Sequence, residues 1–226
     1  MLSQTDKADF YPRFFKAGKG QYAEGDHFIG VTVPDQRKIV KEFWPTTSLD
    51  DISDLLSSEI HELRHTALLI LVAKYENSRE IRDKQVIVEF YLKHKKYINN
   101  WDLVDNSSYK ILGRHAFETQ NPELLWTLAD EENLWSKRIA VVSTMFYVKR
   151  GDFDLLKKII LKNLHHSHDL MHKANGWLLR EMGKKNENEL LEFLKVHYSE
   201  MPRTTLRYAI EKLDPDLRQD FLKGRV

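Results

Sequence analysis

The sequence predicts an all-α protein built from stacked helix pairs, and three observations support this prediction. Only 9 glycines and 6 prolines punctuate 226 residues, which is too few turns for a sandwich or barrel of many short strands. Apolar residues recur at helical spacing along the chain, and no alternating stretch of four or more residues occurs outside 28–33. With 42% hydrophobic and 31% charged residues, the chain can bury a core, and its composition argues against disorder, collagen and a membrane bundle.

The first third of the chain shows three kinds of local signal. The aromatic residues of 10–15 form a helical stripe that we expect to pack in the core. The segment 28–33 alternates and ends at Pro34, which predicts a short extended piece. Ser48, followed by two acidic residues, predicts a helix start, and the apolar spacing of 62–75 predicts a long helix.

The rest of the chain repeats these helix signals. Asn99 or Asn100 can cap a helix that begins near Trp101. Asn121-Pro122-Glu123 and Asp214-Pro215-Asp216 each place proline at the first helical position. The apolar spacings of 138–148 and 178–182 indicate two further helices, so we expect about a dozen in all.

A degenerate repeat runs through these predicted helices. Small residues stand in mid-helix at intervals of 40, 33, 36 and 33 positions, namely Ala67, Ser107, Ala140, Gly176 and Ala209. Steps of this length suit a helix pair, which is the unit of HEAT-like solenoids. We therefore predict an α-solenoid, or superhelix, of HEAT-like repeats that forms one domain over residues 1–226.

Charge is balanced overall but unevenly distributed. The formal net charge is +1, so no global charge indicates a nucleic-acid or membrane partner. Acidic segments at 42–62 and 123–132 alternate with basic ones at 79–96 and 162–185. In a solenoid, alternate helices line opposite faces, so this pattern suits a basic concave groove. Ordinary solvated helix faces are the alternative interpretation.

Composition also limits the chemistry and the location of the protein. The absence of cysteine excludes disulfides, thiolate zinc sites, iron–sulfur clusters and cysteine nucleophiles, and fits a reducing cytoplasm. The longest apolar run, 67–73, is far shorter than the roughly 18 residues of a membrane-spanning helix. The polar start resembles no signal peptide. We expect a cytoplasmic protein.

One candidate site is the pair Trp101 and Asp105, at i and i+4 on one face of a helix. A carboxylate beside a large aromatic ring can stabilise a cationic, oxocarbenium-like sugar and steer a water molecule. Asp102 is expected to serve the first helical turn, where negative charge is favoured. The alternative is a core tryptophan with an aspartate bonded to a neighbouring loop.

Two further segments extend this candidate site. Lys173, Trp177, Arg180 and Glu181 follow one another at helical steps of 4, 3 and 1. Arg138 lies 37 positions after Trp101 and 39 before Trp177, which is close to the repeat length. Side chains from successive repeats can converge on one groove, where two aromatic rings, a carboxylate and guanidinium groups would suit a phosphodiester backbone and a damaged sugar.

Together these segments resemble the DNA alkylation repair proteins of the AlkD type. The resemblance rests on segments in the same order: 28–37 (FIGVTVPDQR), 101–105 (WDLVD), Arg138 in KRIA, 173–181 (KANGWLLRE) and 201–207 (MPRTTLR). It covers nearly the whole chain and implies a monomeric, cofactor-free enzyme that wraps duplex DNA. The implied activity is hydrolysis of the N-glycosidic bond of cationic N3- and N7-alkylpurines such as 3-methyladenine and 7-methylguanine.

The resemblance also implies residue roles. Asp105 would stabilise the sugar cation and position water, and Trp101 and Trp177 would pack against the lesion nucleotide's sugar. DNA-binding roles would fall to Arg37, Arg138, Lys173 and Arg180. The family is thought to work without flipping the base, unlike most glycosylases. Two alternatives remain: a non-catalytic binder of damaged or branched DNA with the same groove, and a helical scaffold for protein partners.

Two histidine motifs suggest metal binding but have simpler interpretations. His61-Glu62-Leu63-Arg64-His65 matches the H-E-x-x-H zinc pattern, yet it lacks a clear third ligand and carries a cation at Arg64. His168 and His172 stand at ligand spacing, but a loop-to-helix junction on a basic face explains them equally well. We expect no metal site.

Overall fold

The computed structural model describes residues 2–226, which divide into two compact units, Met1–Ile111 and Leu112–Val226. The described residues hold helices and no strand, and their one β-type pairing is a bridge between His27 and Ile60. The all-α prediction is therefore confirmed, whereas the extended segment predicted at 28–33 is irregular chain beside that bridge. The single domain over 1–226 stays a prediction.

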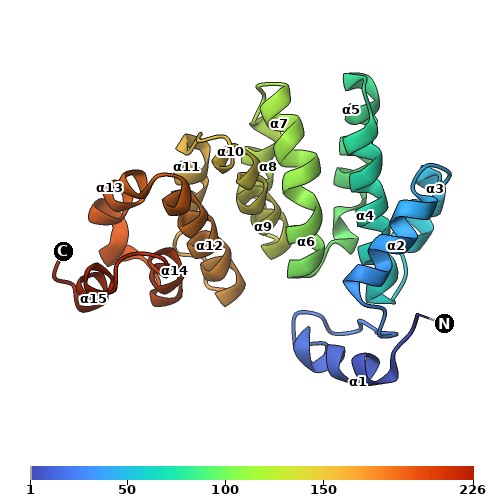
Figure 1. The fold of residues 1–226 in the computed structure, drawn as a ribbon, viewed down its shortest axis with the longest axis horizontal. Helices are drawn as coiled ribbons and strands as arrows, with labels where there is room; N and C mark the ends of the chain where they lie inside the picture. The colour runs from blue at the N-terminus through green and yellow to red at the C-terminus, as the bar shows by residue number, and fades with distance from the viewer. Residues whose placement is uncertain (1) are drawn as a thin grey trace. The chain divides into compact units, whose positions relative to one another are not determined.

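The first unit is organised around one buried helix, α4 (Figure 1). Its helices are α1 (Thr5–Phe14), α2 (Val33–Phe43), α3 (Leu49–Leu56), α4 (His61–Asn77), α5 (Ile81–His94) and α6 (Trp101–Ser108), with a 3₁₀ turn at Lys95–Tyr97. Helix α4 packs against α2, α3, α5 and α6. A helix surrounded in this way must be apolar on all sides. This explains why the longest apolar run of the sequence, 67–73, lies within α4.

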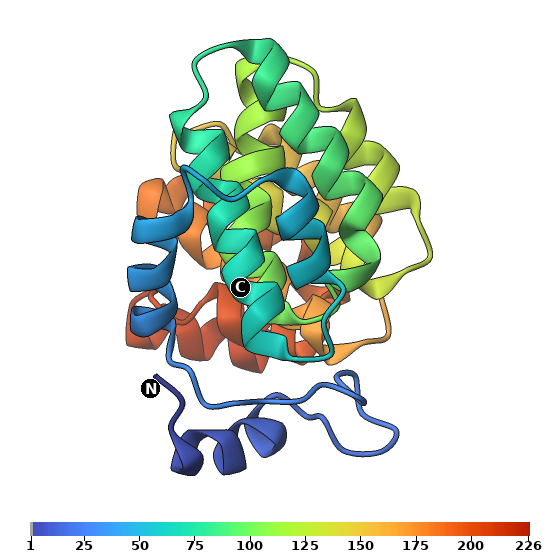
Figure 2. The same ribbon diagram turned by 90° about the vertical axis from the view of Figure 1, so that its right-hand side faces the viewer.

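The N-terminal segment closes one end of this unit. Helix α1 and the chain after it lie beyond the ends at which α2 and α4 begin (Figure 2). Gly30 has φ +76°, and a Cβ there would meet the Gln4 carbonyl oxygen at 2.0 Å. The Glu62 carboxylate accepts hydrogen bonds from the backbone amides of Ile29 and Gly30. These contacts hold the loop against the first turn of α4.

The second unit consists of helices that pack on their sequence neighbours. They are α7 (Arg114–Glu118), α8 (Glu123–Asp130), α9 (Leu134–Ser143), α10 (Met145–Val148), α11 (Asp154–Lys162), α12 (Asp169–Lys185), α13 (Glu187–His197), α14 (Arg203–Ala209) and α15 (Pro215–Lys223), with a 3₁₀ turn at Tyr198–Glu200. A π-helical turn, Tyr109–Gly113, joins α6 to α7. Helix α12 packs against α9, α10, α13 and α14.

The small residues of the sequence repeat lie where helices meet. All five are buried: Ala67, Ser107, Ala140, Gly176 and Ala209. At Gly176 the approach of α12 to α14 leaves no room for a side chain, because a Cβ would stand 2.5 Å from the Thr205 oxygen. At Gly176 the repeat therefore marks close helix packing.

Most predicted helix starts are confirmed by their caps. Ser48 forms a capping box with Asp51 at the start of α3. Asp214 caps α15, whose first residue is Pro215. Pro122 precedes the first residue of α8 instead of being it, a shift of one position from the prediction. No helix within residues 2–226 has the length and apolar character needed to cross a membrane.

Candidate functional site

The pair Trp101 and Asp105 stands at the start of α6, as predicted. The Asn100 side chain accepts a hydrogen bond from the Trp101 amide at 2.8 Å and so fixes where the helix begins. The indole of Trp101 is half-buried, with the Phe15 ring stacked 5.5 Å away and the Phe14 ring edge-on at 5.9 Å. These two rings hold the indole plane in place.

Asp105 lies one turn later and is also half-buried. Burial raises the pKa of Tyr91 on α5, and the nearby negative charge of Asp105 raises it further. The Tyr91 hydroxyl lies 2.9 Å from the hydroxyl of Ser107. The carboxylate therefore stands next to a phenol that stays protonated at neutral pH.

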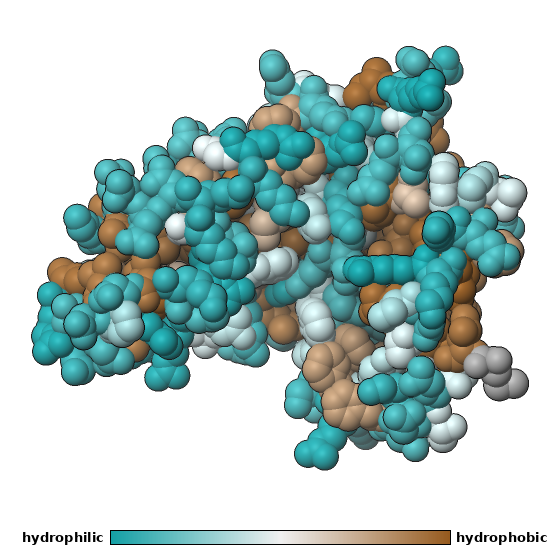
Figure 3. Space-filling view, viewed as in Figure 1, coloured by the Kyte–Doolittle hydropathy of each residue, from teal (hydrophilic) through white to brown (hydrophobic). Residues whose placement is uncertain are grey.

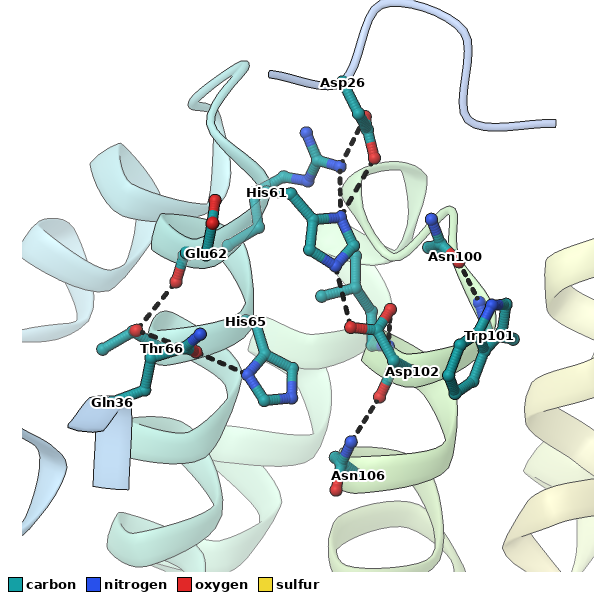
Figure 4. Close-up of polar contacts among 12 residues, drawn as sticks. Asp26, Gln36, His61, Glu62, His65, Thr66, Asn100, Trp101, Asp102 and Asn106 are labelled. Atoms are coloured by element: carbon teal, nitrogen blue, oxygen red, sulfur yellow. Dashed lines mark hydrogen bonds and ion pairs between the residues drawn. The ribbon is translucent and has the colours of Figure 1, made fainter. Parts of the chain in front are cut away.

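A buried charged network lies beside Trp101 (Figure 4). His61 bonds through Nδ1 to Asp26 at 3.0 Å and through Nε2 to Asp102 at 2.8 Å. Arg64 donates to the other oxygen of Asp26 at 2.7 Å. Since carboxylates only accept hydrogen bonds, both ring nitrogens of His61 carry protons and the ring is a cation. The network joins the N-terminal loop, α4 and α6.

The carboxylates determine the charge of His61. Burial by itself lowers its pKa, but the adjacent Asp102 and Asp26 outweigh burial and raise the pKa to about 9. The reverse holds at Asp26, where burial favours the neutral acid, but the bond from His61 and the charge of Arg64 lower its pKa. His61 and Asp26 are thus both ionised at neutral pH.

The H-E-x-x-H motif is accounted for by bonds within the protein. His61 binds two aspartates, Glu62 binds the loop amides, and Nδ1 of His65 lies 2.6 Å from Oε1 of Gln36. The described part of the chain holds no cluster of three or more histidine, aspartate or glutamate side chains suited to a metal ion. At the second histidine motif, Nδ1 of His168 accepts from the Leu170 amide and caps α12.

The aromatic stripe of α1 is not core, contrary to the prediction. Phe10 is 54% and Phe14 48% exposed, and only Phe15 is buried. One side of α1 packs against the first unit, and its other side faces solvent. Figure 3 therefore shows a hydrophobic patch over α1. Periodicity identified the helix but overestimated its burial.

These rings border a cavity of about 270 Å³, here called the aromatic pocket. Its aromatic walls and its polar floor come from four elements and the loop between α1 and α2. The lining includes Tyr11, Phe14, Phe15, Phe28 and Trp101 as walls, with Gln36, His61, Glu62, His65, Asp102 and Asn106 as polar groups. Asp102 was expected to serve only the first helical turn, but its carboxylate also bonds to His61.

The predicted residues of the second unit lie on α9 and α12. Trp177 is half-buried, Lys173 pairs with Asp169 at 2.8 Å, and Arg180 pairs with Glu211. Arg138 is only 4% exposed, and its guanidinium donates to the Leu170 carbonyl at 2.5 Å. Arg138 therefore ties α9 to the first turn of α12.

Within each unit, the structure places part of the predicted site on one helix. Trp101 and Asp105 share one helix of the first unit, and Arg37 is exposed on α2 of the same unit. Trp177, Lys173 and Arg180 share α12 of the second unit. A meeting of Trp101 and Trp177 at one nucleotide stays a prediction. The His61–Asp26–Asp102 network was missed, and its one sequence signal, the H-E-x-x-H motif, suggested zinc instead.

Comparison with known proteins identifies the fold and the family of the chain. A solved structure described as a predicted DNA alkylation repair enzyme from Enterococcus faecalis superposes with a TM-score of 0.73 at 18% identity. The similarity covers 95% of this chain and 98% of that chain, and it shows a shared fold. No curated protein matches the sequence. The family described as DNA alkylation repair enzyme matches residues 1–213, and the chain therefore belongs to this family.

Proposed function

We propose that this protein is a DNA glycosylase that hydrolyses the N-glycosidic bond of cationic N3- and N7-alkylpurines in duplex DNA. Membership of the DNA alkylation repair enzyme family supports a repair function. The single observation that supports the reaction is the Trp101–Asp105 pair, with its indole held by two phenylalanine rings at the capped start of α6. Such a pair suits a positively charged sugar next to a carboxylate.

The chemistry needs little from the protein. An alkylated purine already carries positive charge, so the bond from C1′ to the base nitrogen breaks with both electrons leaving on the base. The carboxylate of Asp105 stabilises the resulting sugar cation and orients a water molecule. The water oxygen bonds to C1′ and its proton passes to Asp105 or to solvent. No general acid is required, because the leaving base is neutral.

DNA binding in this proposal uses exposed cations and the second tryptophan. Trp101 and Trp177 pack against the sugar of the lesion, while Arg37, Lys173 and Arg180 contact phosphates. Lys173 and Arg180 then exchange their carboxylate partners for phosphate oxygens. The burial of Arg138 indicates that it supports binding by holding α9 against α12. The proposed enzyme is a cytoplasmic monomer that needs no cofactor or metal.

Release of free base from DNA tests the proposal. Duplex DNA containing 7-methylguanine is incubated with the protein, and the released base is measured by chromatography. We expect release by the wild type and a loss of roughly 100-fold in Asp105→Asn, with duplex binding retained. Asp54→Asn, an exposed neutralisation on α3, is the matched control and should keep full activity.

The same experiment separates the alternatives. Duplex binding without base release by the wild type would favour the non-catalytic DNA binder. An absence of DNA affinity even at low salt would favour a protein scaffold, because phosphate contacts make DNA binding stronger as salt is lowered. Equal release by Asp105→Asn and the wild type would exclude Asp105 as the catalytic carboxylate.

A further inference from the structure

A histidine-rich segment joins α11 to α12 in the second unit. His165 and His166 precede α12, His168 caps it, and His172 lies in its first turns. Residues 165–168 are here called the histidine turn. What this turn offers to a ligand depends on which ring nitrogens carry protons.

Two backbone amides assign the protons of the histidine turn. The His168 amide donates to Nδ1 of His166 at 3.1 Å, and the Leu170 amide donates to Nδ1 of His168 at 3.1 Å. Each ring accepts from the amide two residues later, as an aspartate or asparagine does in an Asx turn. A ring nitrogen that accepts a hydrogen bond carries no proton. The neutral ring of His166 therefore holds its proton on Nε2, which is a hydrogen-bond donor.

The surroundings of His166 keep its ring neutral. Burial lowers its pKa, and the positive charge of Lys137 on α9 lowers it further, as do His168 and His172 when they are protonated. Protonation of Nδ1 would also displace the His168 amide from that atom. His166 is therefore a neutral N–H donor at pH 7 and not a cation.

This donor is open to solvent. Nε2 of His166 has no hydrogen-bond partner within the described part of the chain, and it is not among the atoms that the protein shields from water. The backbone that carries it is fixed on both sides. The His166 amide donates to the Asn163 carbonyl at 3.2 Å, and Nε2 of His172 donates to the His166 carbonyl at 2.5 Å. The fixed backbone holds an accessible N–H in place.

Cations lie on both sides of the histidine turn. Nζ of Lys137 donates to Oδ1 of Asn163 at 3.2 Å, directly before the turn. Lys173, which pairs with Asp169, lies close enough to His168 for its charge to lower the pKa of that ring. Ammonium groups beside an oriented N–H donor are the partners that phosphate oxygens take in protein–DNA complexes. The turn therefore suits a phosphate group.

We infer that His166 contacts a backbone phosphate of duplex DNA by donating its Nε2–H, as a neutral donor beside Lys137 and Lys173. The identity of the ligand rests on the proposed function, in which Lys173 and Arg180 of α12 contact phosphates. Salt dependence comes from cations that displace counterions from DNA. A neutral donor instead fixes the position of the phosphate, so it adds affinity without adding salt dependence.

The affinity for undamaged duplex DNA tests this contact without any catalysis. It is measured by fluorescence anisotropy at pH 7 between about 50 and 200 mM salt. In His166→Asn the amide oxygen can replace Nδ1 as the acceptor for the His168 amide, but no group replaces Nε2–H. Affinity should fall roughly 2- to 12-fold, the value of one hydrogen bond, with an unchanged slope of log affinity against log salt.

Two further variants separate the donor from charge and from the turn as a whole. Lys173→Gln removes a cation and should reduce the salt slope by about one. His165→Asn, the matched control, changes the exposed neighbouring histidine and should keep both the affinity and the slope of the wild type. Thermal unfolding checks that each variant folds. Independently of any variant, the ¹H–¹⁵N NMR spectrum of the wild type should show the His166 proton on Nε2.

The inference is overturned if His166→Asn binds DNA as well as the wild type, if it lowers the salt slope as Lys173→Gln does, or if His165→Asn loses as much affinity. A proton on Nδ1 of His166 would also overturn it. Base release by a protein whose DNA affinity does not depend on His166 would leave the glycosylase proposal standing without this contact. A His166-dependent affinity without base release would support the contact and overturn the glycosylase.

Discussion

Nε2 of His61 lies 2.8 Å from the carboxylate of Asp102, and this bond joins the first turn of α4 to the first turn of α6. Asp102 is the residue directly after Trp101, so the position of the proposed catalytic helix depends on a histidine 41 residues away. His61 also contacts the rings of Phe15 and Phe28. One buried cation thus supports both the helix and the aromatic wall beside it.

Replacing that cation should be strongly destabilising. His61→Gln leaves Asp102 without its cationic partner and Asp26 with Arg64 alone, and breaking a buried ion pair costs roughly 3–5 kcal/mol. Urea unfolding should show this loss. His27→Gln is the matched control, because it removes a histidine from the loop that carries Asp26 and the His27 side chain is 70% exposed. It should change stability by less than about 0.5 kcal/mol.

A double variant separates charge from packing in this prediction. Adding Asp102→Asn to His61→Gln removes the uncompensated carboxylate, so the double variant should be more stable than the sum of the two single losses predicts. Additive losses of unfolding free energy would mean that His61 stabilises the fold through packing and not through its charge.

The same network predicts a decline of stability at alkaline pH. The pKa of His61 is raised to about 9 in the folded protein, against an ordinary value near 6.5. The folded state therefore binds this proton more tightly than the unfolded state does. Its contribution is complete below pH 6.5 and is lost as the pH rises through 9, by an amount on the order of 3 kcal/mol.

Urea midpoints measured between pH 6 and 9.5 should show this decline. His61→Gln lacks the titrating group, so its stability should be lower at pH 6 and nearly flat across the range. A wild-type midpoint that does not fall above pH 7 would contradict an imidazolium at position 61.

Local signals were readable in the sequence, whereas long-range partners were not. The caps at Ser48, Asn100 and Asp214 act over one to three residues, so the letters themselves identify them. The bonds of His61 to Asp26 and Asp102 span 35 and 41 residues, and no local pattern carries that information. The spacing of the histidines was visible, but their partners decide between a zinc site and an ion pair.

Burial of α1 was also beyond local reasoning. An aromatic stripe predicts an apolar helix face, but the width of the covered side depends on what packs against it. The chain after α1 covers Phe15 and leaves Phe10 and Phe14 half in solvent. The small-residue repeat was more informative, because close helix approach excludes larger side chains wherever it occurs.

Gly176 offers a sharp test of that close approach. In Gly176→Ala the new Cβ would lie 2.5 Å from both the Thr205 carbonyl oxygen and Cβ of Tyr208, so α12 and α14 must separate. We expect a loss of roughly 1–3 kcal/mol in thermal or urea unfolding, as for other overpacked sites. Gly183→Ala on the same helix is the matched control, because its nearest neighbour is the flexible end of Leu190. Both changes gain the same helix propensity, so the control should cost less because the end of the Leu190 side chain can move, whereas the α14 backbone at Thr205 cannot. Equal losses at the two positions would contradict a tight contact at Gly176.

The aromatic support of Trp101 should influence base release without altering the stability of the fold. Phe14 is 48% exposed, and its ring meets the Trp101 indole edge-on at 5.9 Å. Phe10 is 54% exposed and stacks on the ring of Phe14. An aromatic pair contributes about 0.5–1.5 kcal/mol, so Phe14→Ala should lower kcat/KM for 7-methylguanine release roughly 2- to 12-fold. Phe10→Ala removes a ring of the same size and exposure, and it should leave kcat/KM nearly unchanged. Both variants should unfold at nearly the wild-type urea midpoint, because neither ring is buried. If both lose activity equally, the effect belongs to the exposed hydrophobic face of α1 as a whole and not to the orientation of Trp101.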